Sequence, residues 1–506
     1  SWPPQVNVDD AMTGSGSKLK KVGLVALAGL LLTSAFYSEN SLNKRREALG
    51  LTRLEVPKNA PPLVAFTTVV LGGFRGLIAN ALWVRAMELQ DEDKYFEKVQ
   101  LADWITKLTP HNTTVWIVQA WDMSYNISIK FSDPSDRWRW VYRGIQLLRD
   151  EALKYNPREV PIYRELAWHF QNKMGHNLDD MHLYYKSIWA GWMQEVLGSG
   201  HPNFDELIDP KTPETAVRAR RLREEFKMDP AIMKEVDQQY GPLEWRLPEA
   251  HAIYWAVVGK RNARKKEELI QLRRVIYQSM DLAFKRGRLI ENKGGEGFRF
   301  GENIDLVEKT NAAYEEAMAE DQEMRDHIAR AHKNFLLNAV NYLYVHSRPR
   351  EAERWFKIVK EKYPKDYPEN MTLDEYVLSR FGEDIGETDM NRTISNIYGA
   401  LEQSYLNLID GEIDTYNGYQ ALARTIWSRY QSKIVGGPSE KRVGLRPLSE
   451  MRDDVLRRLL DPQTGLRPEA AAILRSQLGD AIPAPLTNAP PSSPASPAPT
   501  APGTSR

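Results

Sequence analysis

The sequence of 506 residues predicts an all-α protein in which a helical-repeat body, an α-solenoid, lies between an N-terminal transmembrane helix and a disordered proline-rich tail. Three observations favour this fold class. Residues 22–37 form an apolar run without a charged side chain. From residue 74 to residue 475, apolar residues recur at helical spacing, and no sustained alternation typical of strands occurs. Residues 482–506 contain eight prolines, a composition that cannot form a packed core.

The composition excludes several classes of function. Lys and Arg number 68, and Asp and Glu also number 68, so the net charge is zero. A protein built mainly to hold nucleic acid usually has a basic excess, so we do not expect nucleic acid as a partner. The chain has no cysteine, which excludes disulfides, thiolate catalysis, cysteine-ligated zinc and a lipid anchor on cysteine.

The N-terminal region is expected to begin with a flexible polar leader, residues 1–21, followed by a transmembrane signal anchor, residues 22–37. The apolar run spans roughly 24 Å as a helix, slightly less than the hydrocarbon core of a bilayer. A cleaved signal peptide and a buried soluble helix are the alternatives. Lysines at positions 18, 20 and 21 favour a cytoplasmic N-terminus, although three basic residues also follow at 44–46. We therefore expect a single-pass protein of the cell (inner) membrane with an extracytoplasmic body.

A second apolar stretch covers residues 63–84, but Arg75 lies in its middle and three glycines interrupt it. A central arginine is costly in lipid, so a buried soluble helix is preferred to a second span. The remaining organisation then follows. We expect a membrane-proximal linker at 38–73, tryptophan-rich repeats at 74–209, a helical middle segment with a basic stretch at 210–300, C-terminal repeats at 301–481 and the tail at 482–506.

Helix ends marked by proline recur along the body, at Pro110, Pro157 and Pro364. Proline stops a helix because its ring cannot continue the hydrogen-bond ladder. After the first two stops, a large residue precedes a small one by four positions, which places both on one helix face. The residues that we expect to make the packing between helices are Trp116, Ala120, Tyr163, Leu166, Ala167, Phe170, Ala352, Phe356 and Pro364.

Several of these residues resemble the tetratricopeptide repeat. Tyr163, Leu166, Ala167 and Phe170 match the first helix of that family, and Ala352, Phe356, Val359 and Pro364 match the second. The match is degenerate elsewhere, because Gln119 and Met123 stand where the family prefers Leu and Tyr. Segments such as LGGFRGLIANALWVRA and EWRLPEAHAIYWA also resemble large bacterial membrane-anchored repeat proteins without an assigned biochemical function. The resemblance implies a repeat architecture and supplies no chemistry.

Aromatic and charged residues are unevenly distributed. Nine tryptophans lie between residues 83 and 192, and we interpret them as core residues, with an aromatic groove for a peptide or glycan as the alternative. Residues 260–299 carry a net charge of +7 and residues 301–330 a net charge of −6, which indicates two helices that pair or a bipolar surface, with a nucleic-acid patch at 260–299 as the alternative. The glycine-rich segment 293–301 lacks the features of a phosphate loop and is interpreted as a flexible connection.

The most site-like cluster contains His169, His176, Asp179 and His182, whose side chains are plausible ligands for zinc or iron. Their spacing matches no metalloenzyme motif, so polar residues that shape a turn between two helices are the simpler interpretation. His251 is interpreted as a core histidine bonded to a carbonyl oxygen.

The resemblance and the composition together predict a membrane-anchored scaffold that mediates protein–protein interaction or complex assembly at the bacterial cell envelope. We expect no catalytic residues and no cofactor. The expected partners are the membrane, through residues 22–37, and unidentified proteins, while the oligomeric state stays open. The alternative is an envelope enzyme, or a glycan- or metal-binding protein, that uses the region 165–192.

Overall fold

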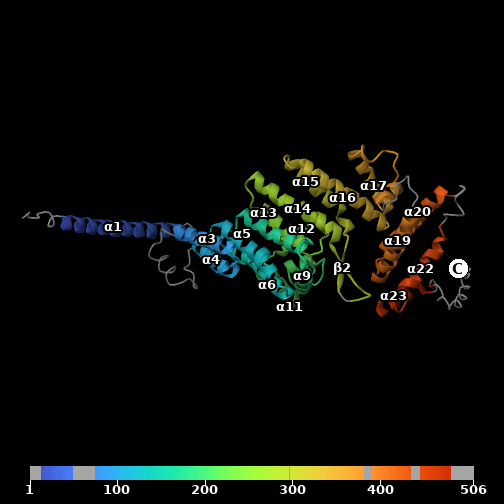
Figure 1. Cartoon of the computed structure of the whole chain (residues 1–506), viewed down its shortest axis with the longest axis horizontal. Coiled ribbons are helices and arrows are strands. Elements are labelled where there is room, and N and C mark those ends of the chain that lie inside the picture. Colours follow the sequence, from blue (N-terminus) through green and yellow to red (C-terminus); the bar gives the residue numbers. More distant parts are fainter. Residues whose placement is uncertain are drawn as a thin grey trace, which may run out of the picture. The chain divides into compact units, whose positions relative to one another are not determined.

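The structure is a computed structural model that describes residues 13–48, 75–295, 297–380, 390–434, 445–479 and 482. Most of the described residues form helices, and the two strands are short, so the all-α class is confirmed (Figure 1). The predicted linker beyond residue 48 and the predicted tail beyond residue 482 lie outside the described residues, as do residues 1–12 of the leader.

The first helix is α1 (Thr13–Ala48), which begins inside the expected polar leader and continues past residue 37. Within it, the segment Val22–Leu42 is long and apolar enough to cross a membrane, and the window that defines it contains no buried residue. Among the described residues, this is the one helix with those properties.

The chain forms two compact units. The first comprises Ser1–Gly287 and Asp305–Ile328, and the second comprises Arg288–Ile304 and Ala329–Arg506. The sequence alone placed domain borders at residues 209 and 300. The units interleave along the chain because the segment 288–304 belongs to the second unit although it is flanked by helices of the first.

The first unit is a set of helices with three π-helical turns. Helices of consecutive sequence pack as pairs, notably α3 with α4, α13 with α14, and α14 with α15. Its α-helices after α1 are α3 (Arg75–Asp91), α4 (Tyr95–Leu108), α5 (Thr113–Trp121), α6 (Pro134–Gln146), α7 (Leu153–Tyr155), α8 (Val160–Trp168), α9 (His182–Leu197), α10 (Phe204–Ile208), α11 (Pro213–Glu224), α12 (Pro230–Tyr240), α13 (Pro248–Lys260), α14 (Lys266–Arg286) and α15 (Val307–Glu320). The π-helical turns are η2 (Asp122–Ile127), η4 (Leu147–Ala152) and η5 (His169–Gly175), and 3₁₀ turns are η3 (Ser128–Lys130) and η6 (Ile304–Leu306).

Helix α13 is the centre of this unit. Every residue from Pro248 to Ala256 is buried, so the helix has almost no solvent-facing side. A helix that is apolar nearly all round is buried in a protein core. Helices α8, α12 and α14 and the turn η5 all pack against α13. His251 lies on it with its Nε2 atom donating to the carbonyl oxygen of Trp245 at 2.9 Å, as the sequence predicts.

The helix ends that contain proline share one backbone conformation. The residue before each proline has nearly the same φ and ψ angles: −130° and 63° at Thr109, −130° and 56° at Asn156, and −131° and 56° at Tyr363. This residue takes neither the α nor the fully extended conformation, so the helix ends there and the chain turns. One local geometry therefore recurs at three places in the chain.

The first two of these ends also begin the same longer pattern. Trp116 Nε1 donates to the carbonyl oxygen of Pro110 at 2.9 Å, and Tyr163 Oη donates to that of Pro157 at 2.8 Å. Each aromatic residue lies on a nine-residue α-helix that runs directly into a π-helical turn, α5 into η2 and α8 into η5. The segment around Pro110 thus repeats 47 positions later around Pro157.

The second unit contains one β-hairpin and seven helices among its described residues. Its strands are β1 (Arg288–Glu291) and β2 (Phe298–Gly301), and its helices are α16 (Arg325–Val345), whose first turn up to Ile328 belongs to the first unit, α17 (Pro349–Lys362), α18 (Leu373–Arg380), α19 (Met390–Asp410), α20 (Ile413–Ile434), α22 (Leu448–Leu459) and α23 (Pro468–Leu478). Helix α17 shows why these segments are helical, since proline begins it and its buried residues Ala352, Trp355, Phe356 and Val359 recur at i, i+3, i+4 and i+7.

The hairpin corrects one interpretation. The glycine-rich segment 293–301 was expected to be a flexible connection, but its second half forms β2, which pairs with β1 in antiparallel register from Arg288 opposite Gly301 to Glu291 opposite Phe298. Four-residue strands are too short to give a period-2 signal in the sequence. Helices α19 and α20 form the main helical hairpin, joined at Gly411, whose positive φ of 83° favours glycine.

Candidate functional site

The candidate site in the first unit is a buried polar network around η5. A π-helical turn has i→i+5 hydrogen bonds, and such turns occur frequently at functional sites. The bond from the His176 backbone N–H to the Gln171 carbonyl oxygen, at 2.9 Å, closes η5. The side chain of Gln171 is buried and donates to the Val275 carbonyl oxygen and to Ser279 Oγ, both at 3.0 Å, which joins the turn to α14.

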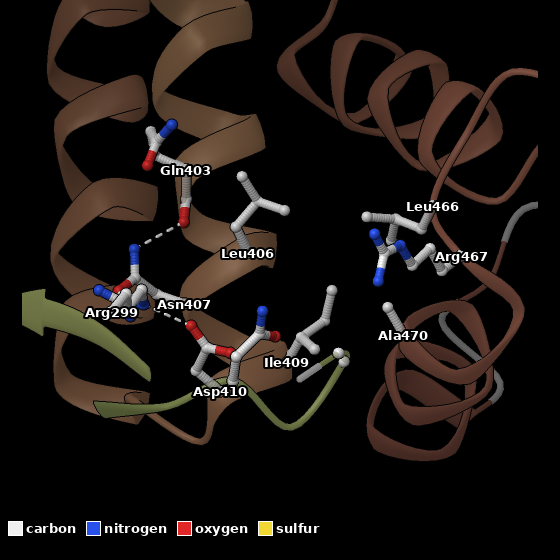
Figure 2. A pocket seen from close by; sticks show the side chains of 12 residues that line it. Arg299, Gln403, Leu406, Asn407, Ile409, Asp410, Leu466, Arg467 and Ala470 are labelled. Atoms are coloured by element: carbon white, nitrogen blue, oxygen red, sulfur yellow. Dashed lines mark hydrogen bonds and ion pairs between the residues drawn. The ribbon is translucent and has the colours of Figure 1, made fainter. Parts of the chain in front are cut away.

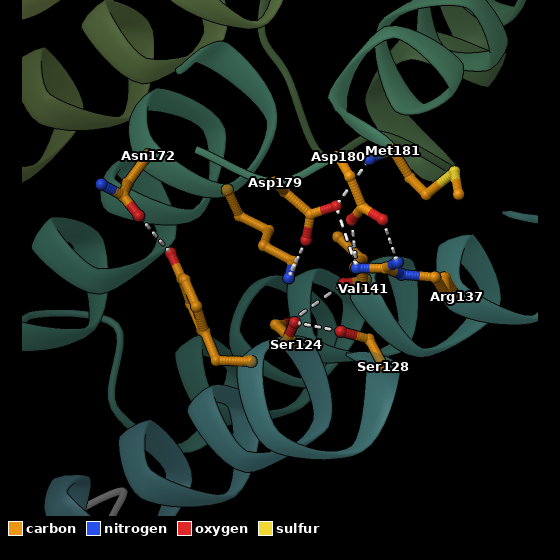
Figure 3. A network of polar contacts seen from close by, with 10 residues as sticks. Ser124, Ser128, Arg137, Val141, Asn172, Asp179, Asp180 and Met181 are labelled. Atoms are coloured by element: carbon orange, nitrogen blue, oxygen red, sulfur yellow. Dashed lines mark hydrogen bonds and ion pairs between the residues drawn. The ribbon is translucent and has the colours of Figure 1, made fainter. Parts of the chain in front are cut away.

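Asp179 is the centre of one half of the network, which Figure 3 shows. Lys173 Nζ donates to Asp179 Oδ2 at 2.5 Å, and Arg137 Nη2 lies 3.2 Å from Oδ1. The backbone N–H of Met181 also donates to Oδ1, at 2.9 Å. The side chains of Lys173, Arg137 and Asp179 are all less than one tenth exposed. Asp180 differs, because its side chain is 69% exposed while it contacts Arg137.

The environment shifts the pKa values of this pair. Burial alone would raise the pKa of Asp179, but the hydrogen bonds from Lys173 and Met181 outweigh burial and lower it. Burial lowers the pKa of Lys173, against the opposing effect of its bond to Asp179. Lys173 Nζ also lies 5.0 Å from the ring centre of Tyr125, a cation–π distance. The carboxylate therefore compensates two buried cations, and an aromatic face shields one of them.

Lys186 and Glu249 form the other half. Lys186 Nζ lies 3.0 Å from His182 Nδ1, and burial lowers the pKa of this lysine to about 8. Glu249 is fully buried on α13, and burial raises its pKa, which the charges of Lys186 and Arg286 oppose. Arg286 Nε lies 3.5 Å from Glu249 Oε1, and the same arginine donates to the Gly175 carbonyl oxygen at the end of η5. Neither carboxylate oxygen of Glu249 accepts a hydrogen bond from the described residues.

The structure gives the four predicted metal ligands different partners. His169 Nδ1 lies 2.9 Å from the Glu165 carbonyl oxygen, Asp179 is held by Lys173 and Arg137, and His182 contacts Lys186. Burial, and then the charge of Arg286, lowers the pKa of His176. Over the part of the chain that is described, no three His, Cys, Asp or Glu side chains gather where they could hold a metal ion. The cluster is a charge network joining η5 to its neighbours.

Sequence reasoning missed the residues that hold this network together, namely Arg137, Lys173, Lys186, Glu249 and Arg286. Two of them had a usable signal. Lys186 is the single charge in the aromatic segment LYYKSIWAGW, and Glu249 is the single acid in the apolar helix PEAHAIYWAVVG. A charge isolated in an apolar helix is either paired in the core or functional.

The predicted packing residues are buried, with one exception. Trp116, Ala120, Tyr163, Leu166, Ala167, Phe170, Ala352 and Phe356 are each less than 8% exposed, whereas Pro364 is exposed at the end of α17. The nine tryptophans between residues 83 and 192 differ in solvent exposure. Trp116, Trp138 and Trp189 are buried, five of the nine are partly buried, and Trp121 is 42% exposed. A continuous groove of exposed tryptophan is therefore not formed by these side chains.

The second unit contains an open cavity of about 460 Å³ between the hairpin turn, α19 and the start of α23 (Figure 2). Arg299 Nε pairs with Asp410 Oδ2 at 2.5 Å on one wall, and its Nη2 donates to Asn407 Oδ1 at 2.8 Å. Arg467 lies on the opposite wall, exposed. The lining residues are Asn292, Gly294, Gly295, Arg299, Gln403, Leu406, Asn407, Ile409, Asp410, Leu466, Arg467 and Ala470.

The hairpin turn shapes this cavity through Gly294. A Cβ atom at that position would lie 2.7 Å from Ala470 Cβ, so only glycine allows the turn to approach α23 this closely. The walls offer carboxamides from Asn292 and Gln403, which can both donate and accept hydrogen bonds, whereas that of Asn407 accepts from Arg299 and donates to the Gln403 carbonyl oxygen. With two arginines against one aspartate, the lining has a positive excess. Such a surface can bind an extended peptide segment through its backbone and an acidic group.

Comparisons with known protein families, with functionally described proteins and with solved structures give no significant match.

Proposed function

We propose that this chain is a membrane-anchored helical-repeat scaffold that mediates protein–protein interaction or complex assembly at the bacterial cell envelope. The observation that carries the proposal is the recurrence of one helix-turn-helix pattern, with matching backbone angles before Pro110, Pro157 and Pro364, behind an apolar helix that has no buried residue in its membrane-length window. Repeated helical units that contact their neighbours form extended surfaces for partners.

The tetratricopeptide-like assignment belongs to the same proposal. Tyr163, Leu166, Ala167 and Phe170 follow one another along α8 and into η5 in the order typical of that family. The orientation that we propose, with the N-terminus in the cytoplasm and the body on the other side of the inner membrane, rests on the lysines that precede the apolar run.

The cavity of the second unit is the proposed contact for a partner segment. Its carboxamides and its positive excess favour a segment that offers backbone carbonyls and a carboxylate. Arg467 is the residue to change, because it is an exposed residue of the cavity lining. Arg475 provides a control, since it is an exposed arginine of α23 that does not line the cavity, although its Nη2 atom donates to the Leu460 carbonyl oxygen at 3.2 Å.

The experiment is affinity purification of the tagged full-length chain from gently solubilised native membranes, followed by mass spectrometry. We expect the same proteins to accompany the parent and Arg475→Glu, and to be lost with Arg467→Glu. They should also be absent from a control that contains residues 1–60 alone. Equal recovery with both arginine variants would remove the cavity from the proposal. Recovery of no protein, together with a stoichiometric metal or glycan on the body, would support the envelope enzyme or binding protein instead.

A further inference from the structure

Helix α3 presents two different sides. Ala79, Ala86 and Leu89 are buried against α4 and its neighbours. On the outward side, Leu77 is 67% exposed and Val84 is 60% exposed. Ala81 is also exposed, and positions 77, 81 and 84 follow the i, i+4, i+7 spacing of one helix face. The first three turns of α3 therefore expose an apolar stripe that no described helix covers.

The same side of α3 becomes charged towards its C-terminal end. Arg85 pairs with Glu88 at 2.9 Å and lies 3.7 Å from Glu92, and these side chains are about half exposed. Glu92 pairs in turn with Lys94 at 2.8 Å. Glu88 is eleven positions after Leu77, so it lies on the same face about 16 Å further along the axis. The polarity of this face changes along the helix, from apolar at the start to hydrated at the end.

The sequence extends the apolar character towards the anchor. Residues 63–74, which immediately precede α3, contain no charged side chain, and the described part of α1 ends at Ala48. A face that is tethered to a membrane anchor meets the bilayer at a high effective concentration, so a small apolar patch suffices for binding. A second protein copy is a poorer occupant, because three side chains fall far short of the roughly 800 Å² per partner of a stable interface.

We propose that α3 is a second membrane contact, in which Leu77, Ala81 and Val84 rest in the lipid interface and the charged end from Arg85 to Glu92 stays in water. This inference rests on the membrane anchoring proposed above. The body would then contact the membrane directly through α3, in addition to its connection to the anchor helix α1. In this arrangement Leu77 and Val84 lie within the lipid interface and Glu88 lies outside the lipid.

The absence of cysteine makes a direct test available, because one introduced cysteine gives one labelling site. The full-length chain is prepared as Leu77→Cys, Val84→Cys and Glu88→Cys, labelled with an environment-sensitive fluorophore and placed in lipid nanodiscs. Leu31→Cys in α1 controls for the anchor. Leu183→Cys, an exposed apolar position on α9, controls for general hydrophobicity. Circular dichroism verifies that each variant keeps the helical content of the parent.

We expect lipids that carry a quencher in their acyl chains to remove most of the emission from positions 31, 77 and 84, and iodide in water to quench positions 88 and 183. Iodide quenching at position 77 equal to that at 183 would overturn the proposal. Blue-shifted emission at position 77 that the lipid quencher leaves unchanged would also overturn it, since protein would then cover the face. If position 31 escapes the lipid quencher, the anchor itself fails. If only positions 77 and 84 escape it, the anchor stands and α3 does not touch lipid.

Discussion

The network around η5 and the cavity beside α19 handle charge in opposite ways. In the first, Lys173, Asp179 and Arg137 are almost fully buried and pair with one another. In the second, the cation Arg299 is 38% exposed, and its partner Asp410, although only 9% exposed, lines an open cavity. Buried ions must be compensated within the protein, whereas exposed ions are compensated by water. The first region is therefore confined to one arrangement, and the second keeps polar groups available to a partner.

The largest effect is expected from Asp179→Ala, which leaves the buried Lys173 without a carboxylate and Arg137 with only the exposed Asp180. We expect the free energy of unfolding of the first unit to fall by about 3 to 5 kcal/mol. Tryptophan fluorescence during urea unfolding measures it, because among the described tryptophans only Trp355 and Trp427 lie in the second unit. The neighbouring Asp180→Ala is the control and should cost less than about 1 kcal/mol, since Asp180 is exposed. Equal losses of unfolding free energy in the two variants would show that Asp179 is not the residue that compensates the charges of Lys173 and Arg137.

Apolar packing should not distinguish the two units. Trp189 in the first and Phe356 in the second are both buried, so either change to alanine should reduce the free energy of unfolding by about 3 to 5 kcal/mol. Urea unfolding followed by circular dichroism detects both units. If Trp189→Ala were well tolerated while Phe356→Ala was not, the contrast between the units would concern packing as well as charge.

Lys186 predicts a pH dependence for the first unit. Burial lowers its folded pKa to about 8, below the value of 10.5 for a free lysine, so between these two values the unfolded chain binds more protons than the folded chain. Stability should therefore rise as the pH increases above about 8, by at most about 1.4 kcal/mol per pH unit from this group, and show no slope from it below its folded pKa. His182, Glu249 and Arg286 face the same group.

The variant Lys186→Met isolates this contribution. Its unfolding free energy, measured from about pH 7 to about pH 9.5, should lack the rise that the parent shows above about pH 8. At neutral pH it should not exceed that of the parent, because the buried Glu249 loses one of its two compensating cations and keeps only Arg286. Parallel pH profiles for the two proteins would contradict the assignment of this titration to Lys186.

The smallest effect is expected from Arg299→Ala in the second unit. Asp410 is only 9% exposed, but it lines an open cavity that water can enter, so the loss should be about 1 to 2 kcal/mol. Thermal unfolding of the full chain followed by circular dichroism provides the measurement. A loss as large as that of Asp179→Ala would mean that the ion pair of the cavity wall stabilises the fold as strongly as the buried network does. The comparison between the two regions would then no longer hold.

Local features of the fold could be predicted from the sequence. The proline stops, the aromatic residues that follow them and the opposite charge blocks all depend on residues close in the chain or on simple patterns. The charge blocks meet as expected, since α14 packs on α15 and Arg273 pairs with Glu316 and Glu320. The scaffold role and the binding of a protein partner stay predictions.

The network could not be predicted, because its members meet only in three dimensions. Arg137 on α6 reaches Asp179 beyond η5, and Glu249 and Arg286 come from helices far along the chain. The sequence also carries no signal for the π-helical turns, which place Lys173 and Gln171 towards the interior. The sequence indicates the histidines as metal ligands. In the structure, the charge network is formed by the basic and acidic side chains between the helices.

The position of α13 has a consequence for synthesis. Helix α8 and the turn η5 are covered by α13, which follows them in the chain only after four further helices have been made. Until residue 260 has left the ribosome, the apolar face of α8 and the charges of η5 have no permanent cover, and contacts between distant segments form slowly. A chain that stops before Pro248 should therefore be recognised by chaperones and proteases, whereas one that stops after Lys260 gains the central helix of its core.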